Sequence, residues 1–196
     1  MHKPIDALSQ VRYGVFHWHF RASLPWKIAG AMWMAGVIGI MAQVRIPFFP
    51  VPFTGQTFAV LMAGVMLGRR WGGISVAVYA VLGFAGVPWF SGATSGFSPS
   101  SGYLLGFVLA ALFLGYVSNR KPESCSFGKM FILMLFAALV LIYLPGVLWL
   151  GFWMRSMGAT VTIASVFTAG VFPFIAGDVL KAGAAAALTR IPKSLQ

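Results

Sequence analysis

The sequence predicts an all-α membrane protein, a compact bundle of six transmembrane helices with an outer-face interfacial or re-entrant segment before the last helix. Composition is the first reason: 59% of the 196 residues are hydrophobic and only 9% are charged. A soluble domain carries about 25% charged residues to cover its surface. Apolar runs long enough to cross a bilayer recur along nearly the whole chain. The positive charges fall between these runs, as is typical of residues that set membrane topology.

Six apolar segments are the candidate transmembrane helices, and they cover residues 26–43, 55–70, 72–88, 102–118, 127–148 and 172–190. At 1.5 Å per residue, about 18 residues cross the hydrocarbon layer with little tilt. Pro47, Pro50 and Pro52 exclude helix from the first connection, because proline lacks an amide donor and restricts the residue before it. Pro173 is expected to open the sixth helix, where proline is tolerated.

The segment 156–170 is apolar but only about 15 residues long, which is short for a membrane span. Charge decides its placement, because six spans put eleven basic residues on one side and only Arg45 and Arg155 on the other. The eleven are Lys3, Arg12, Arg21, Lys27, Arg69, Arg70, Arg120, Lys121, Lys129, Arg190 and Lys193. Positive residues stay in the cytoplasm, so this count predicts a multi-pass protein of the cell membrane with both termini cytoplasmic. A seventh span would place Arg190 and Lys193 on the outer side of the membrane. The segment 156–170 is therefore predicted to stay at the outer face.

The domain organisation follows from this pattern. Residues 1–25 are predicted to be a cytoplasmic N-terminal segment without a cleavable signal pattern, and residues 26–192 a six-helix, substrate-binding membrane domain. Cys125 is the only cysteine, which excludes an internal disulfide, and it falls in the predicted cytoplasmic loop between the fourth and fifth helices.

The sequence lacks the residues that nucleotide-binding, metal-binding and nucleic-acid-binding sites need. No phosphate-binding loop of the form G-x-x-x-x-G-K-[ST] occurs, and His2, His17 and His19 all precede the first span. One membrane carboxylate and one cysteine cannot assemble a metal site inside the bundle. The net charge of +11 is spread in small groups and accompanies no nucleic-acid-binding motif. We therefore expect no catalytic residue, no metal, no cofactor and no nucleic-acid partner, only a lipid bilayer around the chain.

Asp178 and Lys181 are the only charges that lie well inside a predicted span, away from its ends. Three residues apart on a helix, they share one face. Each charge costs at least about 2.5–3.5 kcal/mol near the membrane centre, so a retained pair needs a reason. Two interpretations stay open: an ion pair that neutralises itself and packs helices, or a ligand site in the outer part of the bundle.

Other polar and aromatic residues fall at the same outer ends. Thr54 precedes the second helix as a candidate cap, and Gln56 lies one turn inside as a candidate ligand contact. The segment 86–96 is free of charge and is either an ordinary connection or a lid that carries Trp89 and Phe90 to a pocket wall. Tyr103 starts the fourth helix and either lines that pocket or lies at the membrane interface.

Small residues form a stripe along the first helix. Ala31, Ala35 and Gly39 repeat every four residues, a spacing that allows close approach of another helix. Packing within the chain and contact with a partner subunit both remain open on this pattern.

Several of these motifs, taken in order, resemble the BioY family, the biotin-specific S components of energy-coupling factor (ECF) transporters. The motifs are Val51-Pro52-x-Thr54-x-Gln56-Thr57, Leu67-Gly68-x-Arg70, Gly86-x-Pro88-x-Phe90, Gly102-Tyr103-Leu104-Leu105-Gly106-Phe107 and Gly177-Asp178-x-x-Lys181. The resemblance covers roughly residues 26–192. The family tends to have two glycines where this chain has Gly92-Ala93, and a proline where it has Ala176.

The resemblance implies a six-helix fold that binds biotin near its outer face, with Asp178, Lys181 and Gln56 as ligand-binding residues and Tyr103 near the pocket. It also implies that the stripe of Ala31 and Ala35, which we extend to Gly39, contacts a transmembrane coupling subunit, and that two separate ATPase subunits hydrolyse ATP.

We therefore expect the chain to be the biotin-capturing subunit of an ECF-type ABC uptake transporter, with Trp89 and Phe90 covering the apolar part of the ligand. A solitary biotin facilitator and an S component for another vitamin are the alternatives.

Overall fold

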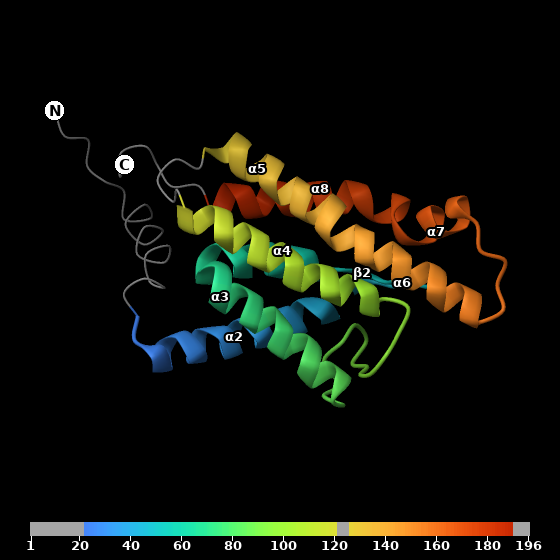
Figure 1. The fold of residues 1–196 in the computed structure, drawn as a ribbon, viewed down its shortest axis with the longest axis horizontal. Helices are drawn as coiled ribbons and strands as arrows, with labels where there is room; N and C mark the ends of the chain where they lie inside the picture. The colour runs from blue at the N-terminus through green and yellow to red at the C-terminus, as the bar shows by residue number, and fades with distance from the viewer. Residues whose placement is uncertain (1–21, 121–125, 190–196) are drawn as a thin grey trace.

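The computed structural model describes residues 22–120 and 126–189, and within them the chain is an all-α bundle. Its helices are α2 (Leu24–Gln43), α3 (Gln56–Phe84), α4 (Ser101–Arg120), α5 (Phe127–Phe136), the π-helical turn η2 (Ala137–Ile142), α6 (Tyr143–Ser156), α7 (Ile163–Gly170) and α8 (Phe172–Leu188). The long helices lie side by side along one direction (Figure 1). Counting the two arms of α3 separately, and α5 to α6 as one helix, they form the predicted six-helix bundle. Most of the predicted N-terminal segment 1–25 lies outside the described residues, and so does Cys125.

The first connection contains no helix, as its prolines predict. Two short antiparallel strands, β1 (Arg45–Ile46) and β2 (Phe53–Thr54), pair here, and the chain between them makes the turn. This ladder fixes the entry of the chain into α3.

Helix α3 is a hairpin of two arms that turns at Gly68. The backbone there has φ 74° and ψ −179°, a conformation that glycine adopts readily and other residues do not. Gln56 and Tyr79, at the far ends of the two arms, are hydrogen-bonded at 2.8 Å, and Gly72 packs on the backbone of Ala63 nearer the turn. The predicted helices 55–70 and 72–88 are thus confirmed as two antiparallel elements, although the second ends four residues early.

The fifth helix is longer than predicted. Helices α5, η2 and α6 continue without a break from Phe127 to Ser156, so the predicted end at residue 148 is wrong. The segment after Trp149 stays apolar, and no left-handed glycine stops the helix before Gly158, where φ is 78°. The π-helical turn lies just before Pro145, whose missing amide hydrogen removes one bond of the ladder.

The segment before the last helix, for which the prediction was an interfacial or re-entrant segment, contains a separate short helix, α7. In α7, Thr162 and Ser165 form a reciprocal capping box, and the helix meets α8 at a bend of 42°. Pro173 lies in the first turn of α8, also as predicted.

Several features of the described residues are those of a membrane protein. Helix α2, α4 up to Ser118, and the rod from α5 to α6 are long and apolar enough to cross a bilayer, and α7 with α8 make a fourth candidate as one broken span. Large apolar side chains face outward on several helices, with Trp33 75% and Leu180 74% exposed. On a soluble protein such a surface would aggregate, whereas in a bilayer it contacts lipid.

Most basic residues of the described helices lie at one end of the bundle. The start of α2, the turn of α3, the end of α4 and the start of α5 gather at one end of the molecule, while the connection 85–100 and α7 lie at the other (Figure 1). Lys27, Arg69 and Lys129 belong to the first end, whereas Arg155 lies at the far end of α6. The predicted charge asymmetry therefore has a structural counterpart in the described residues.

The small-residue stripe of α2 faces inward. Ala31 is 2% exposed and Ala35 is fully buried, while Gly39 lies against the ring of Trp89. In this conformation the stripe packs the chain's own helices and is not an open contact surface, contrary to the prediction. The other face of the helix, which carries Trp33, is the exposed one.

Candidate ligand-binding site

A pocket opens among the ends of the helices away from the Gly68 turn. The space within it is about 590 Å³, a volume that includes the open solvent at its mouth. Its wall comes from the β2 connection, both arms of α3, the segment before α4, the first turns of α4, the junction of η2 with α6, and the first ten residues of α8. The lining residues are Val51, Pro52, Phe53, Thr54, Gln56, Thr57, Tyr79, Phe90, Ser91, Ser100, Tyr103, Leu104, Phe107, Ile142, Tyr143, Phe174, Asp178 and Lys181.

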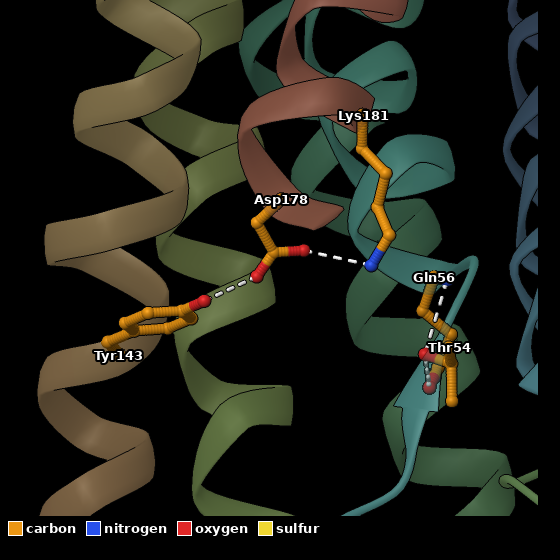
Figure 2. A network of polar contacts seen from close by, with 5 residues as sticks. All are labelled: Thr54, Gln56, Tyr143, Asp178 and Lys181. Carbon is orange, nitrogen blue, oxygen red and sulfur yellow. Dashed lines mark hydrogen bonds and ion pairs between the residues drawn. The ribbon is translucent and has the colours of Figure 1, made fainter. Parts of the chain in front are cut away.

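Asp178 and Lys181 form an ion pair in this wall. One turn apart on α8, they bring Lys181 Nζ to 2.8 Å from Asp178 Oδ1 (Figure 2). Both are largely buried, with side chains 14% exposed for Lys181 and 5% for Asp178. The second carboxylate oxygen, Oδ2, accepts a 2.6 Å hydrogen bond from the hydroxyl of Tyr143 on α6. The buried carboxylate therefore has a partner on each oxygen, as a charge away from water requires.

An aromatic surface supports the lysine. Its ammonium lies 3.7 Å from the centre of the Phe53 ring, a cation–π contact that stabilises a charge with little water around it. Phe53 in turn stacks on Phe174, with ring centres 6.2 Å apart. Gly177 is required for this arrangement, because a methyl group there would overlap the Phe53 ring. The Gly-Asp-x-x-Lys sequence thus brings a charged pair and an aromatic face together.

Gln56 belongs to a second polar network in the pocket wall, which Figure 2 draws beside Lys181. Its Oε1 accepts from the Thr54 hydroxyl at 2.9 Å, and its Nε2 donates to the Tyr79 hydroxyl at 2.8 Å. The cap position predicted for Thr54 is occupied by Gly55. The Thr54 hydroxyl still accepts a hydrogen bond from the backbone N–H of Gln56 at 3.3 Å. These bonds hold the Gln56 amide at the pocket wall.

Phe90 and Tyr103 both line the pocket. The Tyr103 hydroxyl donates to the carbonyl of Gly170 at 2.8 Å, which connects α4 to the end of α7. Phe90 packs edge-on against Tyr79, with ring centres 5.4 Å apart.

Trp89 lies outside the pocket wall, contrary to the prediction. Its indole nitrogen donates to the Tyr79 carbonyl at 2.9 Å, and its ring packs against Tyr79 and Gly39. Neighbouring residues of an extended segment point to opposite sides, so Trp89 faces α2 while Phe90 faces the pocket.

The arrangement suits a neutral or weakly polar ligand with an apolar body. A carboxylate can accept about four hydrogen bonds, so Asp178 retains capacity for donors on a ligand. Lys181 and the side-chain amide of Gln56 supply donors. Phe53, Phe90 and Phe174 supply apolar surface between them.

Sequence reasoning missed Tyr143, Tyr79 and Phe53. Tyr143 lies in an otherwise apolar run, and a buried phenol needs a hydrogen-bond partner; that need was the available signal. Tyr79 carried the same signal within the third predicted helix. Phe53 gave none, since its contact with Lys181 joins residues distant in the sequence.

Known proteins with similar sequences are biotin transporters of one family. The model of the BioY family matches residues 18–195. A probable biotin transporter BioY of Methanothermobacter thermautotrophicus is 45% identical over 134 residues, which are 66% of this chain and 85% of that protein. The biotin transporter BioY of Rhizobium etli is 35% identical over 78% of this chain and 83% of its own length; that of Thermotoga maritima is 32% identical over 82% and 91%.

The fold also matches a solved structure. A crystal structure of the S-component for biotin from an ECF-type ABC transporter superposes with a TM-score of 0.71 and 24% identity, covering 86% of this chain and 92% of that one. The solved structure shows the same fold, and the family model and the relatives show that the chain belongs to the BioY family.

Proposed function

We propose that this chain captures biotin in the pocket between α3, α4, α6 and α8 and is the substrate-binding subunit of an ECF-type uptake transporter. The observation that carries the proposal is the buried pair of Asp178 and Lys181 in the wall of an aromatic pocket. The names of the relatives support the choice of ligand.

The chemistry of biotin fits the groups that line the pocket. Its ureido ring has two N–H donors and one carbonyl acceptor, and its valerate chain ends in a carboxylate. Asp178 accepts from the ureido N–H groups, while Lys181 donates either to the ureido carbonyl or to the carboxylate. Phe53, Phe90 and Phe174 cover the fused ring and the chain.

The orientation in the membrane follows from the charge distribution. We place the end with the α3 turn in the cytoplasm, because Lys27, Arg69 and Lys129 belong to it. The pocket, at the opposite end of the bundle, then faces the outside. Both termini are cytoplasmic in this topology.

A thermal-shift experiment on the purified protein tests the ligand. Biotin and desthiobiotin, which share the ureido ring, are expected to raise the melting temperature, whereas thiamine, riboflavin and pantothenate are not. A ligand at 100 times its dissociation constant adds about 2.7 kcal/mol to stability. Stabilisation by another vitamin without stabilisation by biotin would overturn the proposal.

The dependence on partners needs a separate experiment. The sequence has no phosphate-binding loop, so we propose that a transmembrane coupling subunit and two ATPase subunits drive transport. Vesicles that contain this chain alone are expected to bind biotin without accumulating it. Uptake by the chain alone would make it a solitary facilitator.

A further inference from the structure

One side of the pocket is a short loop, residues 89–94, whose attachment lies outside the pocket. Phe90 and Ser91 line the pocket. The loop folds back on itself through a bridge in which the Phe90 amide donates to the Thr94 carbonyl at 2.9 Å. Gly92 and Ala93 form the reversal with φ of 80° and 55°.

Gln43, the last residue of α2, holds this loop. Its Nε2 donates to the carbonyl of Trp89 at 3.1 Å and to that of Phe90 at 3.0 Å, and its Oε1 accepts from the Ala93 amide at 3.0 Å. One side chain therefore bonds to both limbs of the loop. These bonds join α2 to a segment 46 to 50 residues away in the sequence.

Two further groups support the loop from behind. The Trp89 indole donates to the Tyr79 carbonyl on α3, and the Arg45 guanidinium lies directly against Gly92. Of these attachments, only the Gln43 amide bonds to three residues of the loop at once.

Within the loop, Ser91 has an unused hydrogen-bonding group. Its Oγ is buried and has no hydrogen-bond partner among the described residues, whereas Asp178, Gln56 and Tyr103 in the same wall all have partners. An unpaired buried hydroxyl is costly, and a ligand in the pocket can supply its partner.

We infer that Gln43 is a positioning residue that latches this loop against the pocket and thereby holds the Ser91 hydroxyl for contact with the ligand. The contact rests on the proposed function, but the latch does not, since the bonds that form it are within the protein. The position of α2 thus bears directly on whether the pocket is closed.

A single-cysteine reporter tests the latch in purified protein without ligand. In a Cys125→Ser background, Ser91→Cys reports opening of the loop, and Ser95→Cys, at an exposed position of the same segment, is the matched control. Gln43→Leu removes all three bonds. Gln43→Glu keeps the size of the side chain and one acceptor but sets a carboxylate against two carbonyl oxygens, and it serves as the independent second variant.

Both Gln43 variants are expected to speed maleimide labelling of Ser91→Cys by at least about tenfold, equivalent to about 1.4 kcal/mol, while labelling of Ser95→Cys stays the same. Unchanged labelling of Ser91→Cys would overturn the latch, whatever the ligand is.

The ligand contact has its own measurement. Ser91→Ala is expected to weaken biotin binding by roughly 2- to 12-fold, the range for a neutral hydrogen bond, and Ser91→Thr, which keeps the hydroxyl, to restore it in part. Parent-like affinity of Ser91→Ala would remove Ser91 from the site. Failure of the proposed function looks different, because the parent protein itself would then not bind biotin.

Discussion

The hydroxyl of Tyr143 donates a 2.6 Å hydrogen bond to Oδ2 of Asp178 and joins α6 to α8 inside the bundle. Because Lys181 occupies the other oxygen, the carboxylate is fixed in orientation from two sides. A binding group fixed in this way pays little conformational entropy when a ligand arrives. The π-helical turn that ends at Ile142 immediately precedes Tyr143, and such turns are frequent at functional sites.

Replacing Tyr143 by phenylalanine tests this relationship. Tyr143→Phe leaves one buried carboxylate oxygen unpaired and should destabilise the protein by about 1.5–3 kcal/mol, the range for a hydrogen bond to a charged group. Tyr103→Phe is the matched control, because it removes a bond to a neutral carbonyl and should cost about 0.5–1.5 kcal/mol. Thermal unfolding of the ligand-free proteins measures both. Equal stability of Tyr143→Phe and the parent would show that the bond contributes nothing.

A pair of glycines on α8 separates pocket shape from helix packing. Gly177→Ala should weaken biotin binding by at least about tenfold, because the added methyl overlaps the Phe53 ring that supports Lys181. At Gly183 the same methyl meets only Phe131 at an ordinary 3.7 Å, so Gly183→Ala should bind like the parent. Calorimetric titration of both variants decides. Parent-like affinity of Gly177→Ala would mean that Phe53 has no part in the site.

The reversal of the pocket loop gives a test of backbone conformation. Ala93 has φ 55°, in the left-handed region that disfavours residues with a β-carbon. Ala93→Gly should leave folding and binding intact, whereas Ala93→Val should lose about 1–2 kcal/mol of stability through its branched side chain. Melting temperatures compare the two. A valine variant as stable as the glycine variant would contradict the described conformation.

Topology can be checked at the single cysteine. We predict that Cys125 is cytoplasmic, because it lies between α4 and α5, whose adjoining ends are at the basic end of the bundle. In intact cells a membrane-impermeant maleimide should react with it only after the membrane is opened. Labelling from outside would reverse the proposed orientation.

The sequence predicted most of the fold because the signals were local. Local structure depends directly on the long apolar runs, on the three prolines of the first connection and on Pro173. The helices and the helix-free connection that these features predict are confirmed. The end of the fifth helix was placed too early, since the predicted span ends at residue 148 while the helix continues to Ser156. Its stop is the left-handed Gly158, two residues beyond.

The site was predicted only where chemistry lies within one helix or motif. The ion pair of Asp178 and Lys181 follows from their spacing. The bond from Tyr143 joins residues 35 apart and depends on how α6 packs against α8, which no local pattern gives. The inward position of Ala35 could not be decided from the sequence for the same reason, since a stripe of small residues does not say which helix it meets.

Titration calorimetry of biotin against Asp178→Asn, Lys181→Met and the double variant tests the central claim most directly. Asparagine keeps the shape of Asp178 but loses the charged acceptor, and methionine keeps the length of Lys181 without its charge. Each single change should weaken binding roughly 10- to 150-fold, as expected for hydrogen bonds to charged groups worth about 1.5–3 kcal/mol, while the proteins still fold and purify. If the two charges only neutralise each other, removing both is tolerated. A double variant that binds biotin like the parent would contradict the assignment of the site.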